Sequence, residues 1–235
     1  MKNTIAHSLF ALALFAAASM TALAEDAQSK GIITINGGRT TVAMRSLSNN
    51  TSATKHTTGS SGHAVPAPPP AGEIFDNYQQ PGFLCANGTG WTVSGPASAP
   101  GQAWIASAFT PAKTARLHRI YIAVGFVAGA VNGVTVKLAK DAAGLPGAVM
   151  ETWNLAALPA FGAGCPTDVA VSVRRPTLSK NVQYWLIAQT NAATVGTWDA
   201  WNLNSIGDVG PLASNAGAGW VAAGMQTRGA FAVYK

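Results

Sequence analysis

Beyond position 72, short apolar segments alternate with turn-forming residues along the chain. The run LHRIYIAV has the alternation of a half-buried strand, with Leu117, Arg119 and Tyr121 on one side and His118, Ile120 and Ile122 on the other. Other segments combine β-favouring apolar residues with flanking Gly, Pro, Asn or Asp. The expected strands are Ala103–Phe109, Leu117–Phe126, Val134–Ala139, Ala148–Leu155, Val169–Val173, Gln183–Gln189, Trp198–Leu203, Trp220–Ala223 and Ala230–Tyr234.

The connections between these segments are short and rich in turn residues. Asp141 to Gly147, DAAGLPG, contains both Gly and Pro and is expected to connect two strands. No long stretch has the periodicity of an amphipathic helix, and no internal repeat is evident. We therefore predict an all-β domain over residues 73–235, an antiparallel β-sandwich with a jelly-roll-like arrangement.

Residues 1–24 have the pattern of a secretory signal peptide. Lys2 precedes a short apolar core, and Ala22-Leu23-Ala24 places small residues before a cleavage point. A membrane anchor is the alternative, but the apolar run is shorter than the roughly 20 residues that span a bilayer. We expect an exported protein, periplasmic, secreted or at the cell surface, without a membrane span.

Two further segments precede the sandwich. Residues 25–45 contain IITINGGRTTVAM, a candidate hairpin with Asn36-Gly37-Gly38 at its turn. An isolated hairpin is marginal in water, so its strands would add to the main domain or to a neighbour. Residues 46–72 are rich in Ser, Thr, Asn and Gly and end in a proline run, which indicates a disordered linker. The two histidines of this linker, His56 and His63, are expected to be solvated.

The chain contains two cysteines, Cys85 and Cys165. Export would place them in an oxidising compartment, where a disulfide forms readily. Closing such a long loop would stabilise the fold by about 4–5 kcal/mol in the loop-entropy model. Two free thiols and a metal pair are the alternatives, although neither cysteine has a His or Cys at the short spacing of a metal site.

Charge argues against nucleic acid as a partner. Charged residues make up 10% of the chain, and removing Lys2 with the leader lowers the formal net charge from +6 to +5. The basic residues are scattered along the sequence, with Arg174-Arg175 the one adjacent pair in the folded region. Binding to several phosphates requires a clustered basic face.

The segment TWDAWNLNSIGDVG (197–210) carries the most candidate chemistry. In an extended strand, Trp198 and Trp201 point to opposite faces, so they cannot form one aromatic platform. Trp201 shares its face with Asp199 and Leu203, which carries more apolar bulk, so we expect Trp201 in the core and Trp198 nearer the surface. The same argument places Tyr184 and Trp185 on opposite faces of a central strand that is covered on both sides.

The tentative binding residues are Trp198, Asn202, Asn204 and Asp208. An exposed tryptophan beside Asn and Asp groups is suited to stacking on a sugar ring. Oxygen donors in a loop can also hold Ca²⁺, but this spacing matches no EF-hand or repeat signature, and Asn and Asp are ordinary turn residues. We expect no metal and no cofactor.

The residues do not indicate an enzyme. His118 is the one histidine beyond position 72, no GxSxG-type elbow occurs, and no carboxylate is paired with the histidine by spacing. Glycoside hydrolysis requires two acids facing one cleft. Asp199 and Asp208 are close in sequence, but their spacing specifies no such geometry.

The motifs GLPGAVMETW (144–153), QYWLIA (183–188) and WDAWNLN (198–204) resemble the bacterial choice-of-anchor R domain. The resemblance covers about residues 75–235 and implies an exported β-sandwich module placed near varied surface-anchoring signals. It transfers no catalytic residue, and the chain shows no anchor motif.

Two functions follow as hypotheses. The first is a noncatalytic exported module of the cell envelope or extracellular space, which acts through protein contacts or structure. The alternative is a carbohydrate-binding module that uses an exposed tryptophan. The expected partner is a protein or a polysaccharide at the cell envelope.

Overall fold

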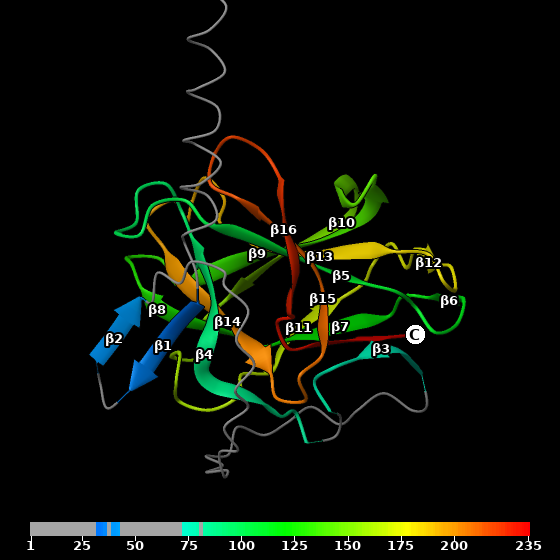
Figure 1. The fold of residues 1–235 in the computed structure, drawn as a ribbon, viewed down its shortest axis with the longest axis horizontal. Helices are drawn as coiled ribbons and strands as arrows, with labels where there is room; N and C mark the ends of the chain where they lie inside the picture. Colours follow the sequence, from blue (N-terminus) through cyan, green and yellow to red (C-terminus); the bar gives the residue numbers. More distant parts are fainter. Residues whose placement is uncertain (1–31, 37–38, 43–71, 80–81) are drawn as a thin grey trace, which may run out of the picture.

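The computed structural model describes residues 32–36, 39–42, 72–79 and 82–235, and all of its regular elements are strands (Figure 1). The expected signal peptide and nearly all of the expected linker lie outside these residues. No helix long and apolar enough to cross a membrane occurs in the described part of the chain. The strands are β1 (Ile32–Asn36), β2 (Arg39–Val42), β3 (Glu73–Asp76), β4 (Cys85–Ser94), β5 (Trp104–Phe109), β6 (Ala115–Arg116), β7 (Arg119–Ile122), β8 (Val124–Ala128), β9 (Gly133–Ala142), β10 (Leu145–Ala156), β11 (Asp168–Val171), β12 (Thr177–Leu178), β13 (Tyr184–Gln189), β14 (Trp198–Asn204), β15 (Val209–Asn215), β16 (Val221–Thr227) and β17 (Phe231–Tyr234).

The strands form two packed layers, which confirms the predicted antiparallel β-sandwich. One layer is a six-stranded sheet in the order β10-β9-β13-β5-β15-β16. The other combines the sheets β11-β7-β17-β3 and β2-β1-β4-β14-β8, which adjoin because β8 follows β7 after a single residue. From β5 onward the chain crosses repeatedly from one layer to the other, as a jelly-roll-like fold requires.

The main core lies between the two layers and takes apolar side chains from both. Its members include Phe109, Ile122, Leu186, Trp201 and Phe231, each completely or almost completely buried. Alternation supplies these positions, since every second residue of a strand faces inward. The two layers are therefore held together by a single continuous apolar interior.

The six-stranded sheet is also covered on its outer face. Trp185 and Ile187 pack there against small alanines, with Leu145 and Trp220 over them. Asp141 accepts hydrogen bonds from Trp185 Nε1 at 2.7 Å and from Gln183 Nε2 at 2.7 Å. The prediction that Gln183–Gln189 is a central strand covered on both faces is confirmed, because all six residues of β13 are buried.

Most of the predicted strands are observed, with three kinds of difference. Leu117–Phe126 is divided into β7 and β8 at Ala123, and Leu117 enters the core beside Ile120 because it precedes the strand. The connection at DAAGLPG is a two-residue hairpin turn at Ala143-Gly144, where both φ angles are positive. The strands β3, β4, β6, β12 and β15 were not predicted.

The candidate hairpin is present as β1 and β2, and β1 also pairs with β4 through Ile32↔Trp91, Ile33↔Gly90 and Thr34↔Thr89. The expected turn residues Gly37 and Gly38 lie outside the described residues. The hairpin thus extends the five-stranded sheet rather than standing alone.

The expected disulfide is present between Cys85 and Cys165, with Cα atoms 5.6 Å apart. It ties the start of β4 to the loop that precedes β11. Both cysteines also pack against a second cluster on the outer face of the four-stranded sheet, around Tyr78, Phe83 and Tyr121. The bridge therefore fixes a loop onto the body of the sandwich.

The two tryptophans of β14 lie as their alternation predicts. Trp201 is fully buried in the main core, whereas Trp198 is half-buried outside it, against Phe161, Val127 and Ala200. The Trp201 ring covers Gly229 so closely that a Cβ there would overlap the indole. Its Nε1 donates to the carbonyl of Ala230 at 3.0 Å.

Replacing Trp201 with alanine should lower the free energy of unfolding by about 3–5 kcal/mol, since a buried ring and its hydrogen bond are lost. Trp198→Ala should cost clearly less, because its ring is partly in water. Urea unfolding of both variants checks this order. A larger loss for Trp198→Ala would show that the facing of β14 is reversed.

Candidate functional site

The end of β14 and the turn that follows bring together three of the four tentative binding residues. Asn202 is fully buried, and its Nδ2 donates to the carbonyl of Ala123 at 3.1 Å. Its backbone N donates to the same carbonyl at 2.8 Å, and its own carbonyl accepts from Ala230 N at 2.7 Å. Asn202 therefore joins β14 to the β7–β8 junction and to the segment before β17.

Asn204 shapes the tight turn between β14 and β15. Its Oδ1 accepts from Asp208 N at 2.8 Å, and its Nδ2 donates to the carbonyls of Asp208 and Arg228, each at 2.8 Å. The side chain is 3% exposed, so all three contacts are made away from water. An asparagine used in this way stabilises a turn and has little capacity left for a ligand.

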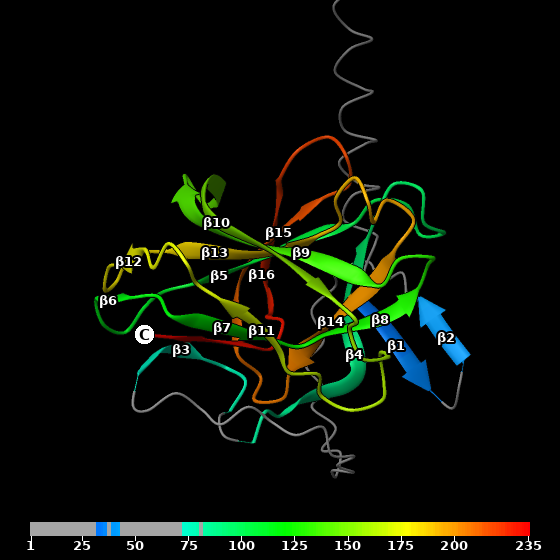
Figure 2. The same cartoon turned by 180° about the vertical axis from the view of Figure 1, so that it is seen from behind.

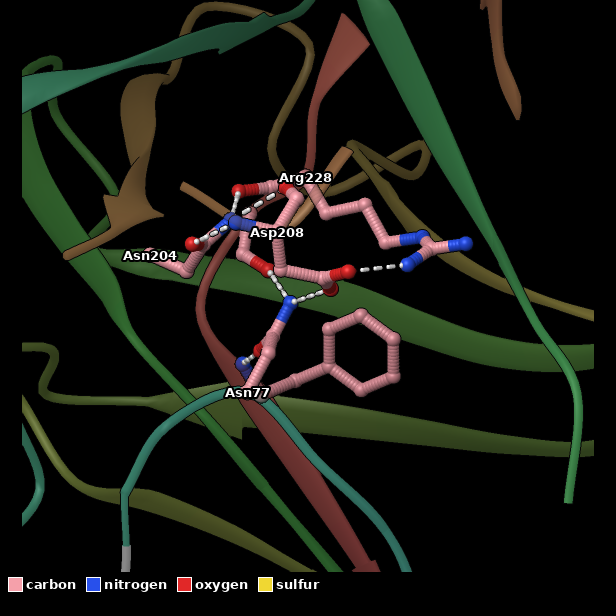
Figure 3. Close-up of polar contacts among 6 residues, drawn as sticks. Asn77, Asn204, Asp208 and Arg228 are labelled. Atoms are coloured by element: carbon pink, nitrogen blue, oxygen red, sulfur yellow. Dashed lines mark hydrogen bonds and ion pairs between the residues drawn. The ribbon is translucent and has the colours of Figure 1, made fainter. Parts of the chain in front are cut away.

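Asp208 occupies the centre of the network in Figure 3. One carboxylate oxygen accepts from Asn77 Nδ2 at 2.9 Å, and the other forms a salt bridge with Arg228 Nη1 at 2.6 Å. Asn77 itself is buried; it donates to Gly229 O at 3.1 Å and accepts from Phe231 N at 2.8 Å. The network therefore connects the end of β3 to the β16–β17 segment and the β14–β15 turn.

Arg228 is held in place by more than its carboxylate. Its guanidinium lies 5.6 Å from the centre of the Phe75 ring, within the range of a cation–π contact. It also lies directly on Gly210, where any Cβ would collide with the guanidinium. A planar cation enclosed between a ring, a glycine and a carboxylate is a packed structural element.

These contacts give the tentative binding residues internal roles. The polar atoms of Asn202, Asn204 and Asp208 contact backbone groups and the side chains of Asn77 and Arg228. Asn202 Oδ1 alone among the side-chain oxygens of these three residues has no hydrogen-bond partner in the described part of the chain. No group of three or more His, Cys, Asp or Glu side chains in the described residues is arranged to hold a metal ion. Trp198 lies near the opposite end of β14 and joins a separate cluster.

Sequence reasoning missed a surface groove between the edge strand β10 and the loop after β11. It has a volume of about 480 Å³ and is lined by Val149, Glu151, Thr152, Trp153, Val173 and Arg174. The motif GLPGAVMETW contains four of these residues, but the loop that closes the groove is distant in sequence.

Two side chains build the groove. Glu151 is 5% exposed and accepts from Ser172 Oγ at 2.6 Å and from the backbone N of Val173 and Arg174 at 2.8 and 3.2 Å. Trp153 is half-buried, and its Nε1 donates to Val171 O at 2.9 Å. Both side chains bond β10 to β11 and to the loop that follows it. The valines that line the groove, Val149 and Val173, are exposed to solvent.

The main core also contains an acid that the alternation of β14 places inward. Asp199 is fully buried, and neither of its carboxyl oxygens has a hydrogen-bond partner among the described residues. Burial, and secondarily the charge of Asp168, raises the pKa of Asp199 to about 8. Burial likewise raises the pKa of Asp168 to about 7, opposed by a hydrogen bond from the Val124 backbone. Asp199 is therefore an interior carboxyl group and Asp168 a half-buried one, and burial favours the neutral form of both.

Asp199, Asp208 and His118 lie apart from one another. Asp199 faces the core near the start of β14, whereas Asp208 follows the other end of that strand and is paired with Arg228. His118 is half-buried and accepts at Nδ1 from Arg119 Nε at 3.3 Å. The geometry supports packing and binding roles for these groups more readily than acid–base chemistry at one substrate.

The buried carboxyls should make stability depend on pH. Their pKa values in the folded protein lie above the value of about 3.9 for an unfolded aspartate, so the folded state binds more protons between about pH 4 and 8. The free energy of unfolding should therefore fall as pH rises through that window. Urea unfolding at pH 5 and pH 8.5 measures the effect.

Asp199→Asn should remove much of this pH dependence, because the amide keeps the shape of the side chain but does not titrate. Asp141→Asn is the matched control, since Asp141 lies at an exposed hairpin where hydrogen bonds from Trp185, Gly144 and Gln183 outweigh burial and lower its pKa. Stability that rises between pH 5 and pH 8.5 would contradict the burial of ionisable Asp168 and Asp199.

Comparison with known proteins identified no relative. No protein-family model matches the chain, and neither a curated protein nor a solved structure is significantly similar to it.

Proposed function

We propose that the chain is a noncatalytic exported module of the cell envelope or extracellular space, which acts through protein contacts or structure. The observation that carries this proposal is that the polar side chains first expected to bind a ligand form hydrogen bonds and a salt bridge within the fold. Asn204 and Asp208 hold the fold together, so their polar side chains are explained without a ligand. The resemblance to the choice-of-anchor R domain supports the same class of function.

Export is supported by two independent features. The N-terminal residues have the composition of a signal peptide. The Cys85–Cys165 bridge is of the kind that persists in oxidising compartments and is rare in the cytosol. The protein would therefore meet its partner in the periplasm, at the surface or outside the cell.

Carbohydrate binding is the second candidate, and the groove on β10 favours it. Its volume of about 480 Å³ is within the range of small-ligand sites, and Trp153 and Arg174 supply a ring and a cation at its edge. Trp198, the residue first expected to stack on sugar, is packed against Phe161 and is less suited to this role.

Fractionation of the native host tests the first proposal. The protein should be found outside the cytosol with its disulfide formed, and in-cell crosslinking should join it to a protein of the envelope. A cytosolic protein with free thiols would contradict it. Binding to a glycan panel that Trp153→Ala abolishes, while Trp104→Ala keeps it, would favour the second candidate instead.

A further inference from the structure

Basic residues that are scattered in the sequence gather at one end of the sandwich. Five of the ten lysines and arginines between positions 72 and 235 lie on or beside the short strands β6 and β12. We call this surface the basic end; all five of its side chains are exposed, and they are Lys113, Arg116, Arg174, Arg175 and Lys180.

Hydrogen bonds hold the three loops of the basic end together. Arg116 pairs with Thr177 across β6 and β12, and its Nε donates to the carbonyl of Arg175 at 3.2 Å. Lys180 N donates to Thr114 Oγ1 at 2.9 Å, beside Lys113. Arg174 Nη1 donates to Met150 O at 3.1 Å, which ties the same surface to β10. The cations are therefore displayed from a connected framework.

Acidic side chains do not neutralise the basic end. The one salt bridge among the described residues is Arg228–Asp208, which lies elsewhere. Glu151 contacts the backbone of Arg174, but it is buried. Its carboxylate accepts hydrogen bonds from Ser172 Oγ and from the backbone N of the loop that follows β11. Two exposed acids border the basic end. Glu73 adjoins Ile74, whose carbonyl accepts from Ala112 N at 3.1 Å beside Lys113, and Asp141 accepts from Gln183 Nε2 at 2.7 Å. Neither forms a salt bridge with the five cations, which outnumber them. The basic end is thus a site of unbalanced positive charge.

Exposed valines accompany these cations. Val173, next to Arg174, is 88% exposed, and Val182, two residues after Lys180, is 46% exposed. Val171 and Val149 are also about half exposed beside the groove that Arg174 lines. A polyanion in water would use the cations alone and would leave the valines without a role.

We propose that the basic end docks on the surface of an anionic phospholipid bilayer. Its cations would bind headgroup phosphates, while Val173 and Val182 would enter the interfacial region between headgroups. Each Lys or Arg near such a surface strengthens binding by about fivefold. Charge and apolar exposure at the same loops favour this partner over an acidic polysaccharide.

The position of the basic end leaves the rest of the molecule accessible. In Figures 1 and 2, β6 and β12 lie at one end of the sandwich, and the β1–β2 hairpin lies at the other. A module docked through the basic end would present the hairpin end away from the bilayer. This inference deepens the proposed function, on which it rests for placing the protein beside a membrane.

Vesicle flotation with the purified, disulfide-bonded protein tests the inference. The protein should bind vesicles of phosphatidylglycerol and phosphatidylcholine, bind pure phosphatidylcholine vesicles far less, and lose affinity as salt is raised. Arg174→Ala with Arg175→Ala should weaken binding by about 30-fold, at roughly fivefold for each charge. Lys137→Ala is the matched control. It removes a cation of β9 that is not part of the basic end, so this variant should bind as the parent does.

Val173→Ser separates a bilayer from a soluble polyanion. It should weaken vesicle binding by about three- to tenfold, since an apolar contact is lost at constant charge. Arg174→Lys with Arg175→Lys should retain binding, and a melting curve should show that each variant is folded. Equal binding to neutral vesicles, or no effect of the double alanine variant, would overturn the inference.

Polygalacturonate bound as tightly as the vesicles, with no effect of Val173→Ser on either, would also overturn it and assign the surface to acidic polysaccharides. Because the assay uses purified protein, it does not depend on location in the cell. If the protein does not bind vesicles but is found in the envelope, the membrane inference is wrong and the proposed function is unaffected. If the protein is found in the cytosol, the proposed function is wrong and the vesicle result is unaffected.

Discussion

The contact of the Trp201 ring with the backbone at Gly229 and Ala230 is the interaction on which the rest of the structure depends. It brings β14 of one sheet against the segment that leads into β17 of another, where the Phe231 ring lies tilted to the indole with ring centres 5.8 Å apart. We call the line of contact between these two segments the seam. Together with the Leu203↔Gly229 bridge and the Ala230 N to Asn202 O hydrogen bond, it joins the two sheets of the second layer.

The polar side chains of the WDAWNLN motif are best understood as parts of the seam. Asn202 and Asn204 donate second hydrogen bonds to the carbonyls of Ala123 and Arg228, each of which also accepts from a backbone N of β14. The partly exposed salt bridge between Asp208 and Arg228 lies beside these hydrogen bonds. A motif that looks like a ligand patch can therefore serve the fold, and functional surfaces must be sought where side chains are exposed.

The sequence predicted the faces of the strands better than their number. Alternation placed Trp201 inward and Trp198 outward because one face of β14 carries more apolar bulk, and it placed Tyr184 and Trp185 on opposite, covered faces of β13. It missed β4 and β15 because Asn87, Gly88 and Pro211 are typical of turns, and tertiary pairing overrides such local preferences. It also missed the groove and the basic end, since both join loops that are far apart in the chain, and only the topology brings Arg116 and Arg175 together.

A double-mutant cycle between Asn77 and Asp208 tests most directly whether the polar side chains of the seam serve the fold. The free energy of unfolding is measured for Asn77→Ala, Asp208→Ala, the double variant and the parent. The 2.9 Å hydrogen bond between the two side chains predicts a coupling energy of about 0.5–3 kcal/mol, beyond what each residue contributes alone. Additive losses, or a domain whose stability neither change affects, would contradict the account and return Asp208 to the residues available for a ligand.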